Sequence, residues 1–314
     1  MQQAEAPKPA RSRRRSVFDV NALMPLLALG AAVAKLLSGV VWLAHRYQTA
    51  TDISYANGER HKLDVYRPRA GAAGDGAPVI VFFYGGRWQT GEKGIYRFLA
   101  ATLATRGYVV VVPDYRLYPE VRFPDFIADG AKALRWTRDN IATFGGDARR
   151  LFIMGHSAGA YIAAMLALDR AWLGDVGLDP NRDIAGLIGV SGPYDFLPLR
   201  DPDLIAIFGG DDRPITQPIS YAEGRKPPAL LLTGAVDRAV GPGNSTRLAA
   251  KLQRSGNDVT ERVYPRFGHL TIMAGFAPLV ALFLSPLRDL DAFVARIRLG
   301  AQQGASLRAE APAP

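Results

Sequence analysis

The 314-residue sequence contains no cysteine. That absence excludes a disulfide scaffold, a thiolate metal site and a cysteine nucleophile, and it leaves the redox compartment undecided. Histidine is scarce, with four residues, and the sequence has neither Cys/His zinc spacing nor an aromatic-rich RNA-binding signature. It also lacks an internal repeat and a mid-chain linker, so its length fits one large domain. The net charge of +9 comes partly from "RSRRR" at residues 11–15 and does not indicate nucleic-acid binding.

Composition divides the chain into four segments. Residues 1–16 are polar and basic, which is typical of disorder, and residues 17–48 are dominated by an apolar helical run. Residues 49–300 have the composition of a globular domain. Residues 301–314 are small, polar and proline-bearing, and we expect them to be a disordered tail.

The apolar run Leu23–Ala44 is about long enough to span a bilayer as a helix. As a membrane anchor it would keep Arg11–Arg15 cytoplasmic and place the domain on the outer, periplasmic face. Lys35 opposes this interpretation, because a lysine in mid-span costs about 2.5–3.5 kcal/mol. A helix packed on the domain or lying at a membrane interface, and a signal peptide cleaved near "AVA" (Ala32–Ala34), remain alternatives. A cytoplasmic location stays open with them.

The middle of the chain alternates between strand-like and helix-like segments. Apolar runs typical of strands buried on both faces occur at 77–86, 108–116, 149–159, 183–196 and 228–237. An antiparallel pair at 52–56 and 61–68 precedes them, and a last strand is expected at 260–269. Helical patterns occur at 96–107, 123–147, 158–170, 245–256 and 284–300. This alternation predicts an α/β fold with a mostly parallel central sheet, helices on both faces and ligands beyond the carboxyl ends of the strands.

A candidate nucleophile lies in "GHSAG", residues 155–159, between a predicted strand and a predicted helix. The pattern G-x-S-x-G in this context predicts a tight turn that needs small neighbours and exposes the hydroxyl of Ser157. An incidental serine in a glycine-rich loop is the alternative interpretation. A serine needs a base before it can act as a nucleophile at neutral pH.

Few residues can supply that base. His45 belongs to the N-terminal apolar segment, and His61 lies beside an early turn. His156 is inside the elbow, and we expect it to point away from the serine. His269 follows the last predicted strand and is the credible base, with a plain surface-loop histidine as the alternative.

The base in turn needs a carboxylate that fixes its tautomer and stabilises its charge. Asp237 directly follows the fifth buried strand and is the best-placed candidate. Asp114 also follows a strand but precedes the serine, so it is expected to anchor its own loop. Asp195 is a weaker rival for the same role.

Backbone donors for an oxyanion are predicted at two places. Ala158 follows the candidate nucleophile, and Gly85 and Gly86 follow the strand that ends at Tyr84. Glycines let that loop bring its N–H groups close to the reacting carbon, and one lost donor costs about 2.7–4 kcal/mol. A plain βα turn would explain the glycines alone.

These motifs resemble those of the α/β-hydrolase superfamily. The chain is most similar to hormone-sensitive-lipase-like esterases and to the neighbouring small carboxylesterase and arylformamidase groups, which carry H-G-G-G or H-G-G-x-W, then D-Y-R-L-A-P-E with F-P, then G-x-S-x-G. The corresponding segments here are "YGGRW" (84–88), "DYRLYPE" (114–120), "FP" (123–124) and "GHSAG" (155–159). The resemblance covers roughly residues 52–300, and the order Ser157, Asp237, His269 also fits it.

Two residues depart from the family motif. Tyr84 replaces the histidine that braces the loop, and Arg87 replaces the third glycine. The Tyr84 hydroxyl can brace the loop, and the Arg87 side chain either attracts an anionic substrate or points to solvent. Tyr84, Arg87 and Trp88 are therefore candidate substrate contacts. The segment between Ser191 and Pro227 is expected to form a small cap of one or two helical turns beside an acyl pocket.

The resemblance implies a serine carboxylic-ester hydrolase that acts on small or medium acyl esters through an acyl-enzyme, with no metal and no cofactor. Its expected partner is a small-molecule ester rather than a nucleic acid, with membrane association through Leu23–Ala44 as a further possibility. An arylformamidase-like amide hydrolase uses the same three residues and stays an alternative. A catalytically inert binding protein of the same fold is the alternative from another class. The oligomeric state and the physiological substrate do not follow from the sequence.

Overall fold

The computed structural model describes residues 46–69, 76–277 and 285–309 of the chain. Within these residues one sheet of eight strands forms in the order β1-β2-β4-β3-β5-β6-β7-β8. Only β2 pairs antiparallel with both of its neighbours, and β3 to β8 run parallel. The strands are β1 (Tyr47–Ser54), β2 (Lys62–Pro68), β3 (Ala77–Phe83), β4 (Val109–Pro113), β5 (Gly146–His156), β6 (Gly186–Val190), β7 (Ala229–Gly234) and β8 (Val259–Tyr264).

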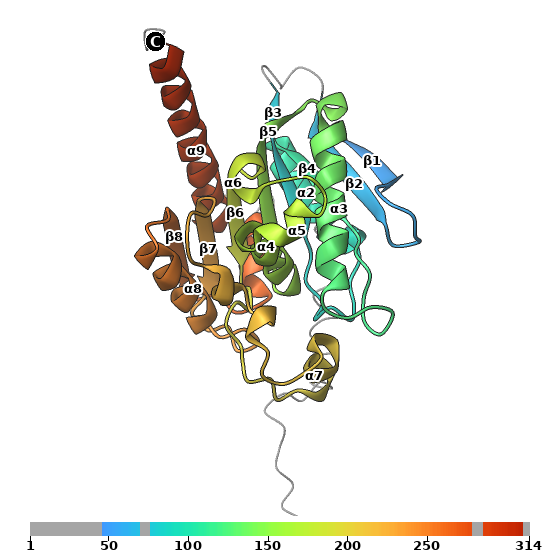
Figure 1. Cartoon of the computed structure of the whole chain (residues 1–314). Helices are drawn as coiled ribbons and strands as arrows, with labels where there is room; N and C mark the ends of the chain where they lie inside the picture. The colour runs from blue at the N-terminus through green and yellow to red at the C-terminus, as the bar shows by residue number, and fades with distance from the viewer. Residues whose placement is uncertain (1–45, 70–75, 278–284, 310–314) are drawn as a thin grey trace, which may run out of the picture.

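Helices cover the sheet (Figure 1). The α-helices are α2 (Arg97–Thr105), α3 (Asp125–Asn140), α4 (Ala158–Leu168), α5 (Arg170–Gly174), α6 (Pro180–Asp183), α7 (Pro202–Phe208), α8 (Gly243–Arg254) and α9 (Ser285–Ala309). Short 3₁₀ helices are η1 (Lys93–Tyr96), η2 (Ile141–Phe144), η3 (Pro214–Thr216), η4 (Pro218–Tyr221) and η5 (Thr271–Phe276). Helices α3 and α4 pack on each other in front of the central strands, and α2 and α9 both contact η5 behind them. This layering confirms the predicted α/β architecture.

The central strands form the core of the domain. Every residue of β3, β4, β6 and β7 is buried, which is why these strands read as continuous apolar runs. The outermost strands β1 and β8 consist of half-buried and exposed residues, apart from the buried Tyr264, because each strand has a partner on one side only. Since β3 to β8 are parallel, the loops after β3, β5, β7 and β8 all emerge at one edge of the sheet.

Two predicted boundaries differ from the structure. The helix expected over 123–147 is shorter in the structure and consists of α3 followed by η2. It ends because Gly145 adopts a left-handed conformation (φ 82°), and β5 starts at the next residue, Gly146. The last predicted helix, expected over 284–300, is α9 in the structure, and it continues to Ala309.

The N-terminal apolar helix expected at 17–48, with its run Leu23–Ala44, lies almost wholly outside the described residues. Tyr47 and Gln48, at its end, already belong to β1. Among the helices that the structure describes, none combines the length and the apolar character needed to cross a bilayer.

Candidate active site

The turn between β5 and α4 has the strained geometry of a nucleophile elbow. Ser157 adopts φ 55° and ψ −122°, a left-handed conformation that costs about 1–3 kcal/mol for a residue with a side chain. A Cβ on Gly155 would lie 2.2 Å from the Gly159 carbonyl oxygen, and one on Gly159 would lie 2.0 Å from the Phe83 carbonyl oxygen. Both positions therefore require glycine, and the turn holds the serine at the catalytic edge of the sheet.

Three loops bring the predicted triad residues together. The Nε2 atom of His269 lies 2.9 Å from the Ser157 hydroxyl, and its Nδ1 atom lies 2.9 Å from a carboxylate oxygen of Asp237. Because a carboxylate only accepts hydrogen bonds, the neutral imidazole carries its proton on Nδ1 and leaves Nε2 free to accept from the serine. This is the arrangement in which an imidazole can take the serine proton.

The carboxylate of Asp237 is held as an anion. Burial raises its pKa, but the hydrogen bond from His269 and the N–H of Val240 outweigh burial and keep the pKa below its usual value. The other carboxylate oxygen accepts from the N–H groups of Ala239 and Val240, at 3.0 and 2.9 Å. The loop after β7 thus orients the Asp237 carboxylate through its own backbone, independently of His269.

The loop after β3 brings backbone N–H groups beside the serine. A Cβ on Gly85 would lie 2.9 Å from the Cβ of Ser157, so only glycine allows this approach. Gly86 has φ 142°, and a Cβ there would lie 2.0 Å from the carbonyl oxygen of Thr90. Ala158 begins α4, so its N–H has no acceptor within the helix, and the positive end of the helix dipole points at the same place.

Tyr96 lies against the same loop. Burial raises the pKa of its hydroxyl to about 12, and the backbone N–H of Gly85 opposes that rise. A Cβ on Gly85 would lie 3.2 Å from Nδ1 of His156, the atom that the Tyr96 hydroxyl contacts. The N–H groups of Gly85, Gly86 and Ala158 stay the predicted donors for an oxyanion.

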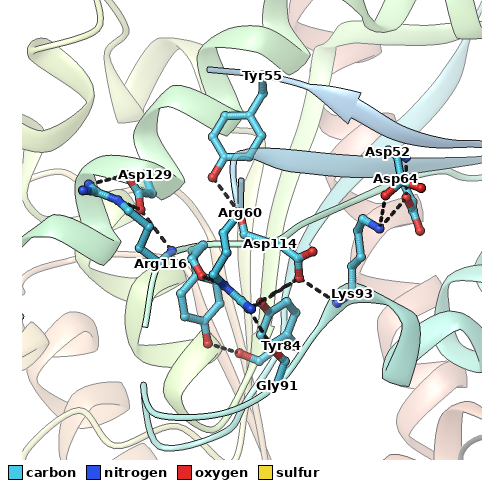
Figure 2. A network of polar contacts seen from close by, with 11 residues as sticks. Asp52, Tyr55, Arg60, Asp64, Tyr84, Gly91, Lys93, Asp114, Arg116 and Asp129 are labelled. Atoms are coloured by element: carbon cyan, nitrogen blue, oxygen red, sulfur yellow. Dashed lines mark hydrogen bonds and ion pairs between the residues drawn. The ribbon is translucent and has the colours of Figure 1, made fainter. Parts of the chain in front are cut away.

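Tyr84 joins a network of polar contacts (Figure 2). Its hydroxyl donates to Asp114 at 2.8 Å and accepts from the guanidinium of Arg60 at 2.7 Å. The same guanidinium donates to the carbonyl oxygen of Gly91 at 2.8 Å, so it holds both ends of the loop. Asp114 also accepts from the N–H of Lys93. The expected bracing role of the tyrosine has the geometry it needs, whereas the buried ring does not lie open to a substrate.

The other two predicted substrate contacts are engaged with the cap segment. Arg87 donates to Asp201 at 2.9 Å, and Asp201 also caps the N-terminus of α7. The Arg87 side chain is therefore paired rather than directed at solvent. Trp88 is buried, and its ring packs edge-on against Tyr161 and Phe208. The segment from Ser191 to Pro227 holds α7, η3 and η4, and α7 has about the two turns expected of the cap.

Several residues of this site escaped the sequence interpretation. Arg60 and Tyr96 belong to no motif, and only their tertiary contacts reveal them. His156 was expected to point away, and it does turn from the serine, but it contacts the carbonyl oxygen of His269 at 3.0 Å. Among the rejected candidates, Asp195 pairs with Arg247. The signal that could have found His156 is its place in the elbow, one residue from the nucleophile.

His61 also proved to have a structural partner. Its Nε2 atom lies 2.9 Å from a carboxylate oxygen of Asp129, which is fully buried. Asp129 also accepts from the guanidinium and the backbone N–H of Arg116. This cluster lies apart from the triad and ties the early hairpin to α3.

The fold and this constellation define the class of protein: an α/β-hydrolase. A profile of the BD-FAE family matches residues 63–252, well over half of the chain. The chain therefore belongs to the BD-FAE family, in the group of hormone-sensitive-lipase-like and arylformamidase-related hydrolases that the motifs indicated.

Known proteins agree with this assignment. The isoprenylcysteine alpha-carbonyl methylesterase ICME of Arabidopsis thaliana is 35% identical over 56% of this chain and 42% of its own length. The kynurenine formamidase of Danio rerio is 32% identical over 61% of this chain and 59% of its own. The chain thus spans about half the length of these relatives. Esterase B from Lactobacillus Rhamnosis has the same fold, with a TM-score of 0.70 at 21% identity over 91% of this chain and 99% of that one.

Proposed function

We propose that the protein is a serine carboxylic-ester hydrolase. Ser157 is the nucleophile, His269 is the general base and then the general acid, and Asp237 orients the histidine and stabilises its charge. The observation that carries the proposal is the continuous hydrogen-bonded relay from Asp237 through His269 to Ser157, with 2.9 Å at each step. The esterase names of several relatives support the same chemistry.

The reaction begins when the Ser157 oxygen attacks the ester carbonyl carbon and its proton passes to Nε2 of His269. The tetrahedral intermediate carries its negative charge on the former carbonyl oxygen, which the N–H groups of Gly85, Gly86 and Ala158 stabilise. His269 then returns the proton to the leaving alcohol, and an acyl-enzyme remains on Ser157. A water molecule, deprotonated by His269, releases the acid and restores the serine.

The preferred substrate class follows from the cap segment beside the elbow. The cap segment contributes Phe196 and Phe208, whose rings pack against Trp88 and Tyr161 beside the elbow. A short cap closed by packed aromatic rings leaves limited room for a long chain. We therefore assign small or medium acyl esters to this site.

Labelling with a fluorophosphonate probe tests the mechanism, because the probe reacts only with an activated serine. Wild type should be labelled and should hydrolyse a short p-nitrophenyl ester. Ser157→Ala should lose the label and lose activity by about 10⁶-fold, as removing a triad serine does elsewhere. Ser255→Ala, at the end of α8 and away from the triad, is the matched control and should behave as wild type. An unlabelled wild type would contradict the proposal.

Amide hydrolysis of the formamidase kind is a second candidate, and the similarity to a kynurenine formamidase favours it. The same triad serves both reactions, so the two are separated by substrate alone. Assays of kcat/KM on a p-nitrophenyl ester, on a methyl ester and on N-formylkynurenine with one enzyme preparation decide between them. A higher kcat/KM on the formamide than on both esters would replace the ester assignment.

A further inference from the structure

A second histidine lies directly behind the proposed base. His156, the residue before the nucleophile, is 1% exposed, and its ring centroid lies 4.9 Å from that of His269. Its Nε2 atom is 3.0 Å from the backbone carbonyl oxygen of His269. Its Nδ1 atom is 3.0 Å from the hydroxyl of Tyr96. The proposed mechanism uses neither His156 nor Tyr96.

Hydrogen-bond chemistry fixes the direction of every contact in this group. A carbonyl oxygen only accepts, so Nε2 of His156 carries the proton and donates it to His269. Nδ1 of the neutral ring then accepts from the Tyr96 hydroxyl. Gly85 packs on the same Nδ1 atom, since a Cβ there would lie 3.2 Å from it. The hydrogen bonds therefore run from Tyr96, beside the loop of Gly85, through His156 in the elbow to the loop of His269.

The side chains of His156 and Tyr96 are both neutral near pH 7. Burial and the neighbouring His269 lower the pKa of His156 to about 3, and the nearby Asp237 opposes this only in part. Tyr96 stays protonated because burial raises its pKa to about 12. A charged His156 would repel the imidazolium that forms on His269 in the transition state, at a ring separation of 4.9 Å. A neutral donor holds the loop without that repulsion.

We infer that His156 and Tyr96 are positioning residues, which hold the backbone of His269 and the loop of Gly85 in register with Ser157. The inference rests on the proposed function, since positioning matters only if the triad acts. It assigns a task to the variable residue of the G-x-S-x-G turn and to a tyrosine outside every motif.

The tautomer of His156 can be observed without any assay of activity. The chain has only four histidines, so ¹⁵N-histidine NMR of the full-length protein can be assigned with single His→Gln variants. His156 should show one neutral ring, protonated on Nε2, unchanged between about pH 5 and 8. In Tyr96→Phe the ring should stay protonated on Nε2, because the His269 carbonyl still accepts that proton, whereas the ¹⁵N resonance of Nδ1 should shift as it loses its hydrogen bond. A wild-type His156 protonated on Nδ1, or one that titrates in this range, would overturn the inference.

Kinetics test the consequence for catalysis. Tyr96→Phe and His156→Leu should each lower kcat by roughly 10-fold with little change in KM, below the ~10²-fold that a 1 Å misplacement of a reacting group can cost. His156→Gln keeps a donor for the His269 carbonyl and should recover part of the lost kcat. Tyr108→Phe is the matched control, because it removes another buried tyrosine hydroxyl, bonded to Asp291 on a different part of the fold.

The outcomes separate this inference from the proposed function. Active-site titration with the probe gives the fraction of competent serine, so a folding defect is not mistaken for a lower kcat. If wild type labels and His156→Leu keeps full kcat per competent site, positioning is wrong while the triad stands. If wild type does not label, the triad proposal fails, and the NMR result alone decides whether the Tyr96–His156 chain exists.

Discussion

The loop after β3, residues 84–91, which we propose supplies the oxyanion donors, is held from two sides that differ in kind. On the outer side Tyr84 bonds to Asp114 and Arg60, whose side chains are 15% and 28% exposed. On the inner side the neutral pair Tyr96 and His156 is buried against the triad. Charged side chains cost little where water can solvate them. A buried positive charge beside His269 would instead oppose the imidazolium that forms during the proposed reaction. Both sides therefore hold the same loop, and none of the hydrogen bonds described for the ionic side involves a triad candidate.

Among variants of this loop, Gly86→Ala has the largest expected effect, because it displaces the backbone of the loop that both sides hold. The new Cβ would lie 2.0 Å from the Thr90 carbonyl oxygen, so the backbone must move and its N–H must leave the site. We expect kcat/KM on a short ester to fall by about 10²–10³-fold, the usual cost of one lost oxyanion donor. Gly107→Ala is the matched control: Gly107 also has a positive φ (95°) but no neighbour within 4 Å. Equal losses in the two variants would mean that backbone strain alone explains the effect.

The sequence predicted which triad candidates would meet better than it predicted the residues that support them. Ser157, Asp237 and His269 follow strands in a motif order, so parallel-sheet geometry was enough to bring them to one edge. The supporting partners have no such rule. Arg60 reaches Tyr84 from the turn between β1 and β2, and Tyr96 reaches His156 across 60 residues of chain. Such pairs depend on the direction of side chains after packing, which neither periodicity nor spacing encodes.

The architecture was likewise predictable, and the element ends were not. The buried strands β3 and β4 are continuous apolar runs, which is a strong pattern in any sequence. The junction of α3 and β5 depends on the left-handed turn at Gly145, a single residue inside a stretch that otherwise continues the helical pattern.

Tyr84→Phe weakens the outer side alone. The change leaves Asp114 and Arg60 without their shared partner, and a hydrogen bond to charged groups contributes about 1.5–3 kcal/mol. We expect a lower thermal midpoint and a kcat reduced by roughly 3- to 10-fold, with the inner side still in place. Thermal denaturation and steady-state kinetics measure both. Tyr108→Phe, which also removes a tyrosine–aspartate bond, should lower stability without the loss of kcat; a Tyr84→Phe enzyme with unchanged kcat would assign the bracing elsewhere.

Asp114→Asn sharpens the comparison by separating charge from hydrogen bonding on the outer side. Burial raises the pKa of Asp114, and the hydrogen bonds from Tyr84 and Lys93 lower it only in part. A raised pKa in the folded state means that the folded protein holds this proton more tightly than the unfolded chain does, so the carboxylate costs stability as the pH rises. The stability of Asp114→Asn relative to wild type should therefore increase as the pH rises above about 4. Thermal midpoints of both proteins, measured from about pH 4 upward, test this direction. A stability of Asp114→Asn that falls relative to wild type as the pH rises would contradict the prediction.

Arg87→Ala has the smallest expected effect, because it removes the tie between the oxyanion loop and the cap rather than either side of the loop. The ion pair with Asp201 is partly solvated, and such pairs contribute about 0.2–1 kcal/mol. Stability should therefore hardly change, while KM should shift by roughly 2- to 5-fold as the cap segment loosens beside the site. The wild-type KM should drift toward that of the variant in about 1 M salt, where exposed charges are screened. Arg135→Ala, which removes the pair with Asp139 on α3, should leave KM unchanged at both salt concentrations. A salt-independent KM in wild type would show that the cap is held by the packing of Phe208 on Trp88 and not by this ion pair.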